Sequence, residues 1–100
     1  MRLSHIQAQV QRRRFRIAAH ALTEASKDGI RTTDIVHAIM TGEIIESYPE
    51  RERLLILGYH PEQDIAIHIV CDYSDPDEVV AVTVYVPSRD RWVADRTRKQ

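Results

Sequence analysis

The stretch that decides the fold is DIAIHIVCDYSDPDEVVAVTVYVP, residues 64–87. Apolar residues alternate with other residues on both sides of a short acidic segment, SDPDE, at residues 74–78. A period of two is typical of strands with one face buried, and Asp-Pro is a common turn start. The stretch therefore predicts two antiparallel strands, at residues 64–73 and 79–87, joined by a tight turn.

Alternation also predicts which residues share a face of the sheet. One face should point toward the helices and holds Ile65, Ile67, Ile69, Cys71, Val80, Val82, Val84 and Val86. The opposite face should stay open and holds Ala66, His68, Val70, Asp72, Ala81, Thr83 and Tyr85. Pairing Tyr73 with Glu78 places His68 opposite Thr83, whereas a shift of two places it opposite Tyr85.

Two more strands precede this pair, and helices precede the strands. Residues 43–49 and 53–60 have an extended pattern. Residues 4–28 have apolar residues at helical spacing, as one helix or as two with a break near Phe15, and a capping box is expected at Ser4 and Gln7. A further helix follows the N-cap candidates 32–34 and ends at Gly42, as Gly29 ends the one before. This order predicts an α+β domain with two to three N-terminal helices on one face of a four-stranded antiparallel sheet.

Length and charge limit the organisation. One hundred residues form one domain, which we divide into an N-terminal helical extension (1–14) and a single α+β domain (15–100) with a short basic C-terminal tail. The net charge is −1, but residues 1–16 carry five arginines and no acidic residue. Basic segments attract phosphates or acidic partners.

Several classes of protein do not fit the composition. The single cysteine, Cys71, excludes an internal disulfide and suits a reducing compartment. No apolar run approaches the roughly 20 residues that span a bilayer, and the N-terminus lacks the apolar core of a secretory signal. We therefore expect a cytoplasmic protein that has no membrane partner. The spacing of the histidines and the cysteine predicts no metal site, and the sequence has no glycine-rich loop that would hold a cofactor.

The chain resembles the bacterial domain-of-unknown-function family 4258 over about residues 15–98. The resemblance rests on the strings FRIAAHAL, GEIIESYP, LLILGYH, IHIVCDY and VTVYVPSRDRW in this order. The family is similar to small ribonuclease toxins of the barnase–EndoU–RelE type. The resemblance therefore implies a RelE-like fold, RNA as a substrate and an antitoxin protein as a partner. One departure is Glu24, which stands where family members usually carry arginine.

RNA cleavage without a metal needs groups that move protons and cations that stabilise the phosphorane. The catalytic candidates are His68, His20, Tyr85 and Thr83, since histidine titrates near pH 6.5 and lies at both family positions. Arg16 and Arg31 are candidate phosphate ligands. The structural alternatives are that His68 is a partly buried residue bonded to Thr83 or Tyr85, that His20 ties a helix to the sheet, and that the arginines are only solvated.

Two functions remain open. The first is a toxin-like domain that binds or cleaves RNA on the open sheet face, as a metal-independent endoribonuclease. The second is a noncatalytic protein-binding or regulatory module that keeps the toxin fold, which Glu24 favours. The N-terminal helix, with Ile6 and Val10 on one side, is expected to pack on its own domain or to form a homodimer.

Overall fold

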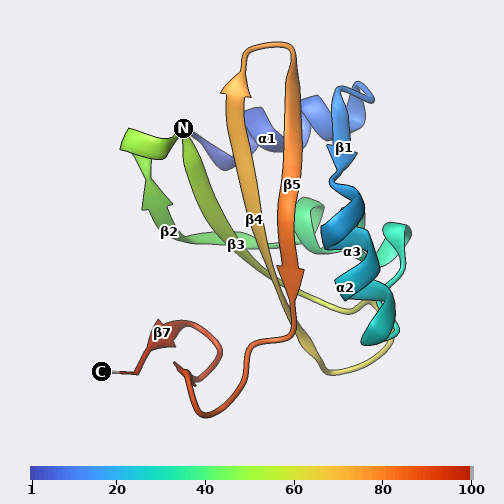
Figure 1. Ribbon diagram of the computed structural model, residues 1–100, viewed down its shortest axis with the longest axis vertical. Coiled ribbons are helices and arrows are strands. Elements are labelled where there is room, and N and C mark those ends of the chain that lie inside the picture. Colours follow the sequence, from blue (N-terminus) through green and yellow to red (C-terminus); the bar gives the residue numbers. More distant parts are fainter. Residues whose placement is uncertain (100) are drawn as a thin grey trace.

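The structure is a computed structural model that describes residues 1–99 (Figure 1). In chain order its elements are α1 (Leu3–Gln11), β1 (Phe15–Ile17), α2 (Ala19–Lys27), α3 (Thr32–Thr41), β2 (Glu43–Tyr48), the 3-10 helix η1 (Pro49–Arg51), β3 (Arg53–Tyr59), β4 (Ala66–Asp75), β5 (Glu78–Tyr85), β6 (Trp92–Val93) and β7 (Thr97–Arg98). Within these residues no helix combines the length and apolar character needed to cross a membrane. The α+β class and the four predicted strands are confirmed.

The main sheet is mixed and has five strands, not the four antiparallel strands that the sequence predicts. Its order is β1-β5-β4-β3-β2, in which β2 to β5 form the expected antiparallel meander. The additional strand, β1, pairs in parallel with β5, with Phe15 opposite Val79 and Ile17 opposite Ala81. Three residues are too few to show a period of two, so the pattern did not reveal this strand.

Strand β1 also settles how residues 4–28 are divided. They form two helices, and the chain leaves α1 through Arg13, which has a positive φ of 61°. The predicted capping box at Ser4 and Gln7 is wrong, because α1 begins at Leu3. Instead, the Gln7 side chain donates hydrogen bonds to the carbonyls of Ile39 and Met40, at 3.2 and 3.1 Å. Gln7 thus satisfies carbonyl groups at the C-terminal end of α3.

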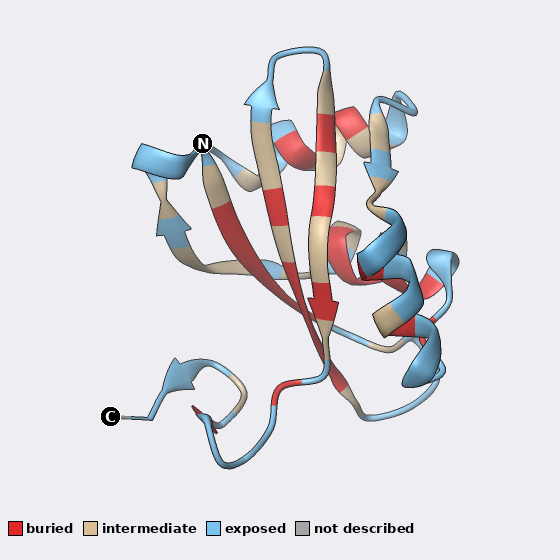
Figure 2. Cartoon of the chain, in the orientation of Figure 1, coloured by how far each residue is buried: buried red, intermediate tan, exposed pale blue. Residues whose placement is uncertain are grey.

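The helices and one face of the sheet enclose the core (Figure 2). Ile67, Ile69 and Cys71 point into it as predicted, and Ile6 of α1 is fully buried there. Burial raises the pKa of the Cys71 thiol to about 12, so this cysteine is an inert core residue. Ile6, together with the partly buried Val10, is therefore used within the chain's own core.

The predicted faces of β5 are wrong over part of the strand. Its core residues are Val79, Ala81 and Val84, whereas Val80 and Val82 are only partly buried and Val86 is exposed. The register shifts where Val70 pairs with Thr83 but Cys71 pairs with Ala81, which leaves Val82 as an extra residue. Such a β-bulge reverses the alternation on one side of it. Pro76 and Asp77 form the turn, and His68 lies opposite Tyr85.

Two glycines allow α3 to lie close to the sheet. A Cβ added at Gly58 of β3 would meet the Cα of Ala38 at 2.6 Å, and one at Gly42 would meet the carbonyl oxygen of Leu57 at 2.5 Å. Both distances are shorter than van der Waals contact, so a side chain at either position would push α3 away from β3. Gly42 also ends α3, as predicted.

The basic C-terminal segment is an ordered hairpin, β6–β7, that lies beyond the end of β5 (Figure 1). Ala94 and Asp95 make its turn, with φ values of 52° and 62°. Ion pairs fasten it to β2: Arg98 bonds Glu46 at 3.0 Å, and Arg96 bonds Glu43. The hairpin therefore covers one end of the sheet face opposite the helices, which the sequence predicts to be open.

Candidate functional site

His68 lies under the C-terminal hairpin and is fully buried. It comes from the middle of β4, on the face opposite the helices, with Leu57 and Tyr85 beside it on the neighbouring strands. Its exposed fraction is 0%. The expectation of an open, accessible His68 is therefore wrong, because a segment 27 residues away in sequence folds over it.

Both ring nitrogens of His68 have partners. Nε2 lies 2.5 Å from the backbone carbonyl oxygen of Asp95, and Nδ1 lies 3.1 Å from the hydroxyl of Tyr85. A carbonyl only accepts, so Nε2 carries the proton. Burial lowers the pKa of His68, although the bond to Asp95 opposes this shift. The ring is therefore neutral at pH 7, Nδ1 is an acceptor, and the Tyr85 hydroxyl donates to it.

Aromatic and cationic side chains surround the imidazole. The Trp92 ring packs edge-on against it with centroids 4.4 Å apart, and the Tyr85 ring packs at 5.1 Å. The Arg98 guanidinium stacks on Trp92, 4.5 Å from the ring centroid. Edge-to-face and cation–π contacts of this kind stabilise a buried cluster. Trp92 therefore plugs this end of the sheet rather than offering a free stacking surface, since only 4% of it is exposed.

Arg98 is held from its other side by β2. Its Nε donates to both carboxylate oxygens of Glu46, at 3.2 and 3.0 Å, and its Nη2 lies 3.4 Å from the Tyr48 hydroxyl. Tyr48 in turn donates to Glu46. Burial raises the pKa of Glu46, but the hydrogen bonds from Tyr48 and Arg98 outweigh it and the net shift is downward. Glu46 is thus ionised and offsets part of the Arg98 charge.

A pocket of about 530 Å³ lies beside this cluster. Its lining residues come from the end of β5, the following loop and the hairpin: Tyr85, Val86, Ser88, Arg91, Trp92 and Arg98. None of these residues carries a carboxylate. Between residues 1 and 99, the Arg91 side chain has no ion-pair partner. The pocket therefore offers one free guanidinium, one partly neutralised guanidinium and two hydroxyls to a ligand.

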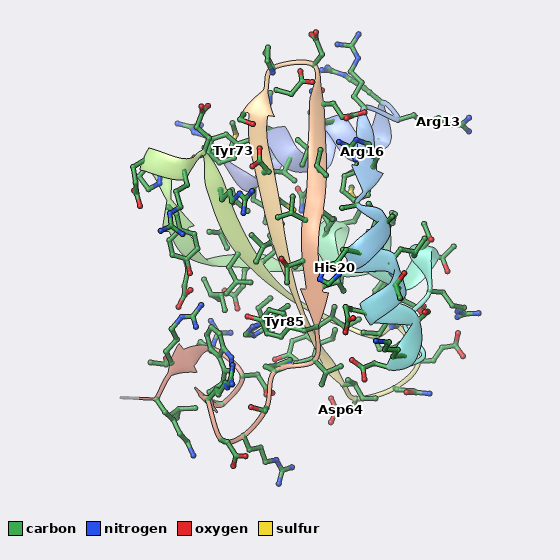
Figure 3. The ribbon with its side chains drawn as sticks, viewed as in Figure 1. Arg13, Arg16, His20, Asp64, Tyr73 and Tyr85 are labelled. Carbon is green, nitrogen blue, oxygen red and sulfur yellow. The ribbon has the colours of Figure 1, made fainter. Side chains whose placement is uncertain are left out.

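The predicted site residues come together only in part. His68 bonds Tyr85, and Thr83 lies on the same face of β5, paired with Val70 beside His68. His20, labelled in Figure 3, is an exposed residue of α2, and it is not among the residues that line the pocket. Arg16 pairs with Glu78 at 2.8 Å. Arg31 pairs with Asp34 and Glu62, so neither predicted phosphate ligand lies at the pocket.

Sequence reasoning missed the arginines that line the pocket. Arg91 and Arg98 belong to the basic tail, which showed a charge excess but no fold-back. The sequence signal for these arginines was that Arg91 and Trp92 are followed by a second arginine-rich run, RTRK. This spacing indicates a hairpin only once the turn at Ala94 and Asp95 is known.

A second buried cluster joins α3 to the β3–β4 loop and is structural. Asp34 accepts from the backbone N–H of Arg31 at 2.8 Å and lies 3.2 Å from His60 Nε2. His60 Nδ1 accepts from the backbone N–H groups of Glu62 and Gln63. These bonds occupy both ring nitrogens. Within residues 1–99, no group of three potential metal-binding side chains forms.

Comparison with known proteins identifies the family of the domain that carries the sheet and the helices. The family described as Domain of unknown function (DUF4258) matches residues 17–86. The chain belongs to this family. The match ends before the hairpin, so four of the six pocket residues lie outside it. No curated protein and no solved structure matches the chain.

Proposed function

We propose that this chain is a toxin-like RNA-binding domain whose ligand site is the pocket between β5 and the C-terminal hairpin. One observation carries the proposal: Arg91, Arg98, Tyr85 and Ser88 line one pocket that has no carboxylate in its lining. Arginine suits phosphate because its planar fork matches the anion's oxygens. Tyrosine offers a ring and a hydroxyl to a nucleotide.

We also propose what the family resemblance implies about relatives and partners. The chain would have a RelE-like relationship and a place in a bacterial toxin–antitoxin system, with an antitoxin partner that covers the pocket. The support for them is the DUF4258 membership together with three helices on one face of the sheet. An antitoxin that blocks an arginine pocket would present acidic side chains to it.

Cleavage is a more demanding form of the same proposal. Tyr85 would accept the proton of a ribose 2′-hydroxyl while its own proton passes to His68 Nδ1, leaving an imidazolium. The 2′-oxygen would then bond to phosphorus as the bond to the 5′-oxygen breaks, and the leaving 5′-oxygen would take a proton from water. Burial lowers the pKa of His68, and the nearby Arg98 charge acts in the same direction. Both effects oppose formation of that imidazolium. The geometry therefore supports RNA binding more strongly than it supports an endoribonuclease.

The test measures binding of a fluorescently labelled single-stranded RNA by anisotropy for the wild type and for Arg91→Gln. We expect the substitution to weaken binding about tenfold, the order of one charged hydrogen-bonded contact. The matched control is Arg51→Gln, an exposed arginine on η1 that does not line the pocket. Equal losses in the two variants would show nonspecific attraction and contradict the pocket assignment.

Induced expression in bacteria tests the toxin part of the proposal. Growth arrest that Arg91→Gln relieves and Arg51→Gln does not relieve is the expected result. His68→Ala is a poor probe, since it removes a fully buried side chain and both of its bonds. Tyr85→Phe keeps the ring and removes only the hydroxyl, so the rate at which this variant cleaves a fully bound labelled RNA, compared with the wild type, tests cleavage separately from binding.

The second candidate is a noncatalytic protein-binding or regulatory module. The environment of His68 favours this module, because both ring nitrogens are bonded within the chain and the ring is buried. Glu24, which stands where the family usually has arginine, is partly exposed and pairs with Lys27 at 3.1 Å. Growth without arrest, no binding of RNA and tight capture of an acidic protein through Arg91 would favour this module over the RNA-binding domain.

A further inference from the structure

We propose that the Tyr85 hydroxyl acts only as a hydrogen-bond acceptor toward the pocket and selects ribose over deoxyribose by accepting from the 2′-hydroxyl. This inference rests on the proposed RNA-binding function and goes beyond it, because it names the chemical group that is recognised and the residue that recognises it. It makes Tyr85 a specificity-determining residue that contacts the ligand itself.

The hydrogen-bond direction is set at the far end of a three-group chain. The Asp95 carbonyl can only accept, so the proton of His68 stays on Nε2. A neutral imidazole then has a lone pair on Nδ1, which can only accept from the Tyr85 hydroxyl. The single proton of that hydroxyl is thus already committed. What Tyr85 offers to a ligand is an oxygen lone pair.

The carbonyl that sets this direction is firmly placed. Asp95 lies in the hairpin turn, between β6 and β7, which pair through Trp92 with Arg98 and Val93 with Thr97. The next residue, Arg96, is tied to Glu43 of β2. Trp92 packs directly on the imidazole, at 4.4 Å between centroids. The His68 ring is therefore held between the turn and the sheet, which prevents it from flipping to exchange the roles of its nitrogens.

The free lone pair has the right neighbours to recognise a nucleotide. Among residues 1–99, only His68 bonds the Tyr85 hydroxyl, and the side chain lines the pocket with Arg91. A phosphate oxygen carries no proton, so it suits Arg91 and not Tyr85. A ribose 2′-hydroxyl can donate and is the group by which proteins distinguish RNA from DNA. A ribonucleotide presents both groups side by side, whereas a deoxyribonucleotide presents only the phosphate.

The experiment compares three single strands of one sequence, with ribose, deoxyribose or 2′-fluoro-ribose throughout. The fluoro sugar keeps an electronegative 2′ substituent but has no proton to donate. We expect the wild type to bind the ribose strand about tenfold more tightly than either other strand. Tyr85→Phe should bring all three affinities within about twofold. Tyr73→Phe, a tyrosine at the opposite end of the sheet (Figure 3), should keep the tenfold ratio.

The outcomes separate this inference from the function on which it rests. If none of the strands binds, the proposed function is wrong and this inference falls with it. If all strands bind through Arg91 but ribose and 2′-fluoro strands bind equally, only the role of Tyr85 is overturned. Imidazole ¹⁵N chemical shifts of the wild type add a check that needs no ligand. The expected result is a neutral ring protonated at Nε2; a proton at Nδ1 would refute the assigned direction.

Discussion

The indole of Trp92 stands edge-on against the buried imidazole of His68, with ring centroids 4.4 Å apart and planes at 88°. This contact joins the C-terminal hairpin to the middle of β4. Through this contact the basic C-terminal segment covers one end of the sheet and forms one wall of the arginine-lined pocket. Stability of the hairpin and formation of the candidate site are therefore linked.

Replacement of Trp92 by alanine should cost about 3 kcal/mol, as for other large aromatic residues that are almost wholly buried. The substitution removes the contacts with His68 and with the Arg98 guanidinium. Urea unfolding followed by far-UV circular dichroism measures the loss, since Trp92 is the single tryptophan and fluorescence would be lost with it. Val93→Ala, at a position that is 52% exposed, is the control and should change little. Similar losses in both variants would contradict the role of Trp92.

Acid should destabilise the protein in a window set by His68. Burial lowers the pKa of His68 in the folded state below its ordinary value of 6.5, so the unfolded chain binds the proton first. The contribution to the free energy of unfolding is full above about pH 6.5 and is lost as the pH falls toward the folded pKa, by at most about 1.4 kcal/mol per pH unit. Urea unfolding between pH 7.5 and 5 measures this slope.

Two variants identify the group responsible for that slope. His68→Gln should remove it, and His20→Gln, on the exposed surface of α2, should leave it unchanged. The groups that act on His68 are Asp95, Glu46 and Arg98. Glu46 has a lowered pKa and loses its own contribution only below about pH 4.5. A slope that persists in His68→Gln would show that another histidine is the source.

Asp34→Asn should destabilise the chain by about 2 to 3 kcal/mol, since a buried carboxylate that accepts several bonds is replaced by a neutral amide. Asp34 bonds the Arg31 guanidinium, the Arg31 backbone N–H and His60. The Arg31 bonds lower the pKa of Asp34, so its contribution is present at neutral pH and disappears as the pH falls below about 3.8. Thermal unfolding at pH 7 gives the difference. The exposed Asp64 supplies the control Asp64→Asn, which should stay within about 0.5 kcal/mol of the wild type.

Gly58→Ala should destabilise the chain by about 1 to 3 kcal/mol through overpacking, because the new methyl group would meet the backbone of Ala38. Gly29→Ala offers a useful contrast. Nothing lies within 4 Å of a Cβ at Gly29, but its φ is +71°, so the expected cost of about 1 kcal/mol comes from the backbone alone. Chemical denaturation of both variants measures the two costs. A smaller loss at Gly58 than at Gly29 would show that α3 can move away from β3 at little cost.

Local patterns in the sequence predicted much of the fold. Alternating residues such as Ile67, Ile69 and Cys71 identified both the strand and its buried face. Gly29 and Gly42 marked the ends of α2 and α3. On β5 the same reasoning failed for the residues that precede the inserted Val82, because a bulge depends on the partner strand as well as on the strand's own pattern.

The candidate site was predicted less completely than the fold. The sequence predicts that His68 and Tyr85 share a face of the sheet, and the structure has the predicted register that places them opposite each other. The sequence predicts Arg16 and Arg31 as phosphate ligands, but each forms an ion pair with a nearby carboxylate. Charge alone does not show which arginine has a free guanidinium, since that depends on which acidic side chain the fold brings beside it.

The sequence by itself determined the α+β order, the four-strand meander and the helix-facing side of β4, because these follow from hydrophobic periods within ten residues or fewer. Only the tertiary structure decided that Phe15–Ile17 joins the sheet, that His68 is covered and that Arg91 and Arg98 line one pocket with Tyr85. Each of these depends on contacts between segments far apart in the chain. The parallel pairing of Phe15–Ile17 depends on β5, and the cover over His68 depends on a hairpin that buries Trp92 and pairs its arginines with β2. No local pattern of residues records either partner.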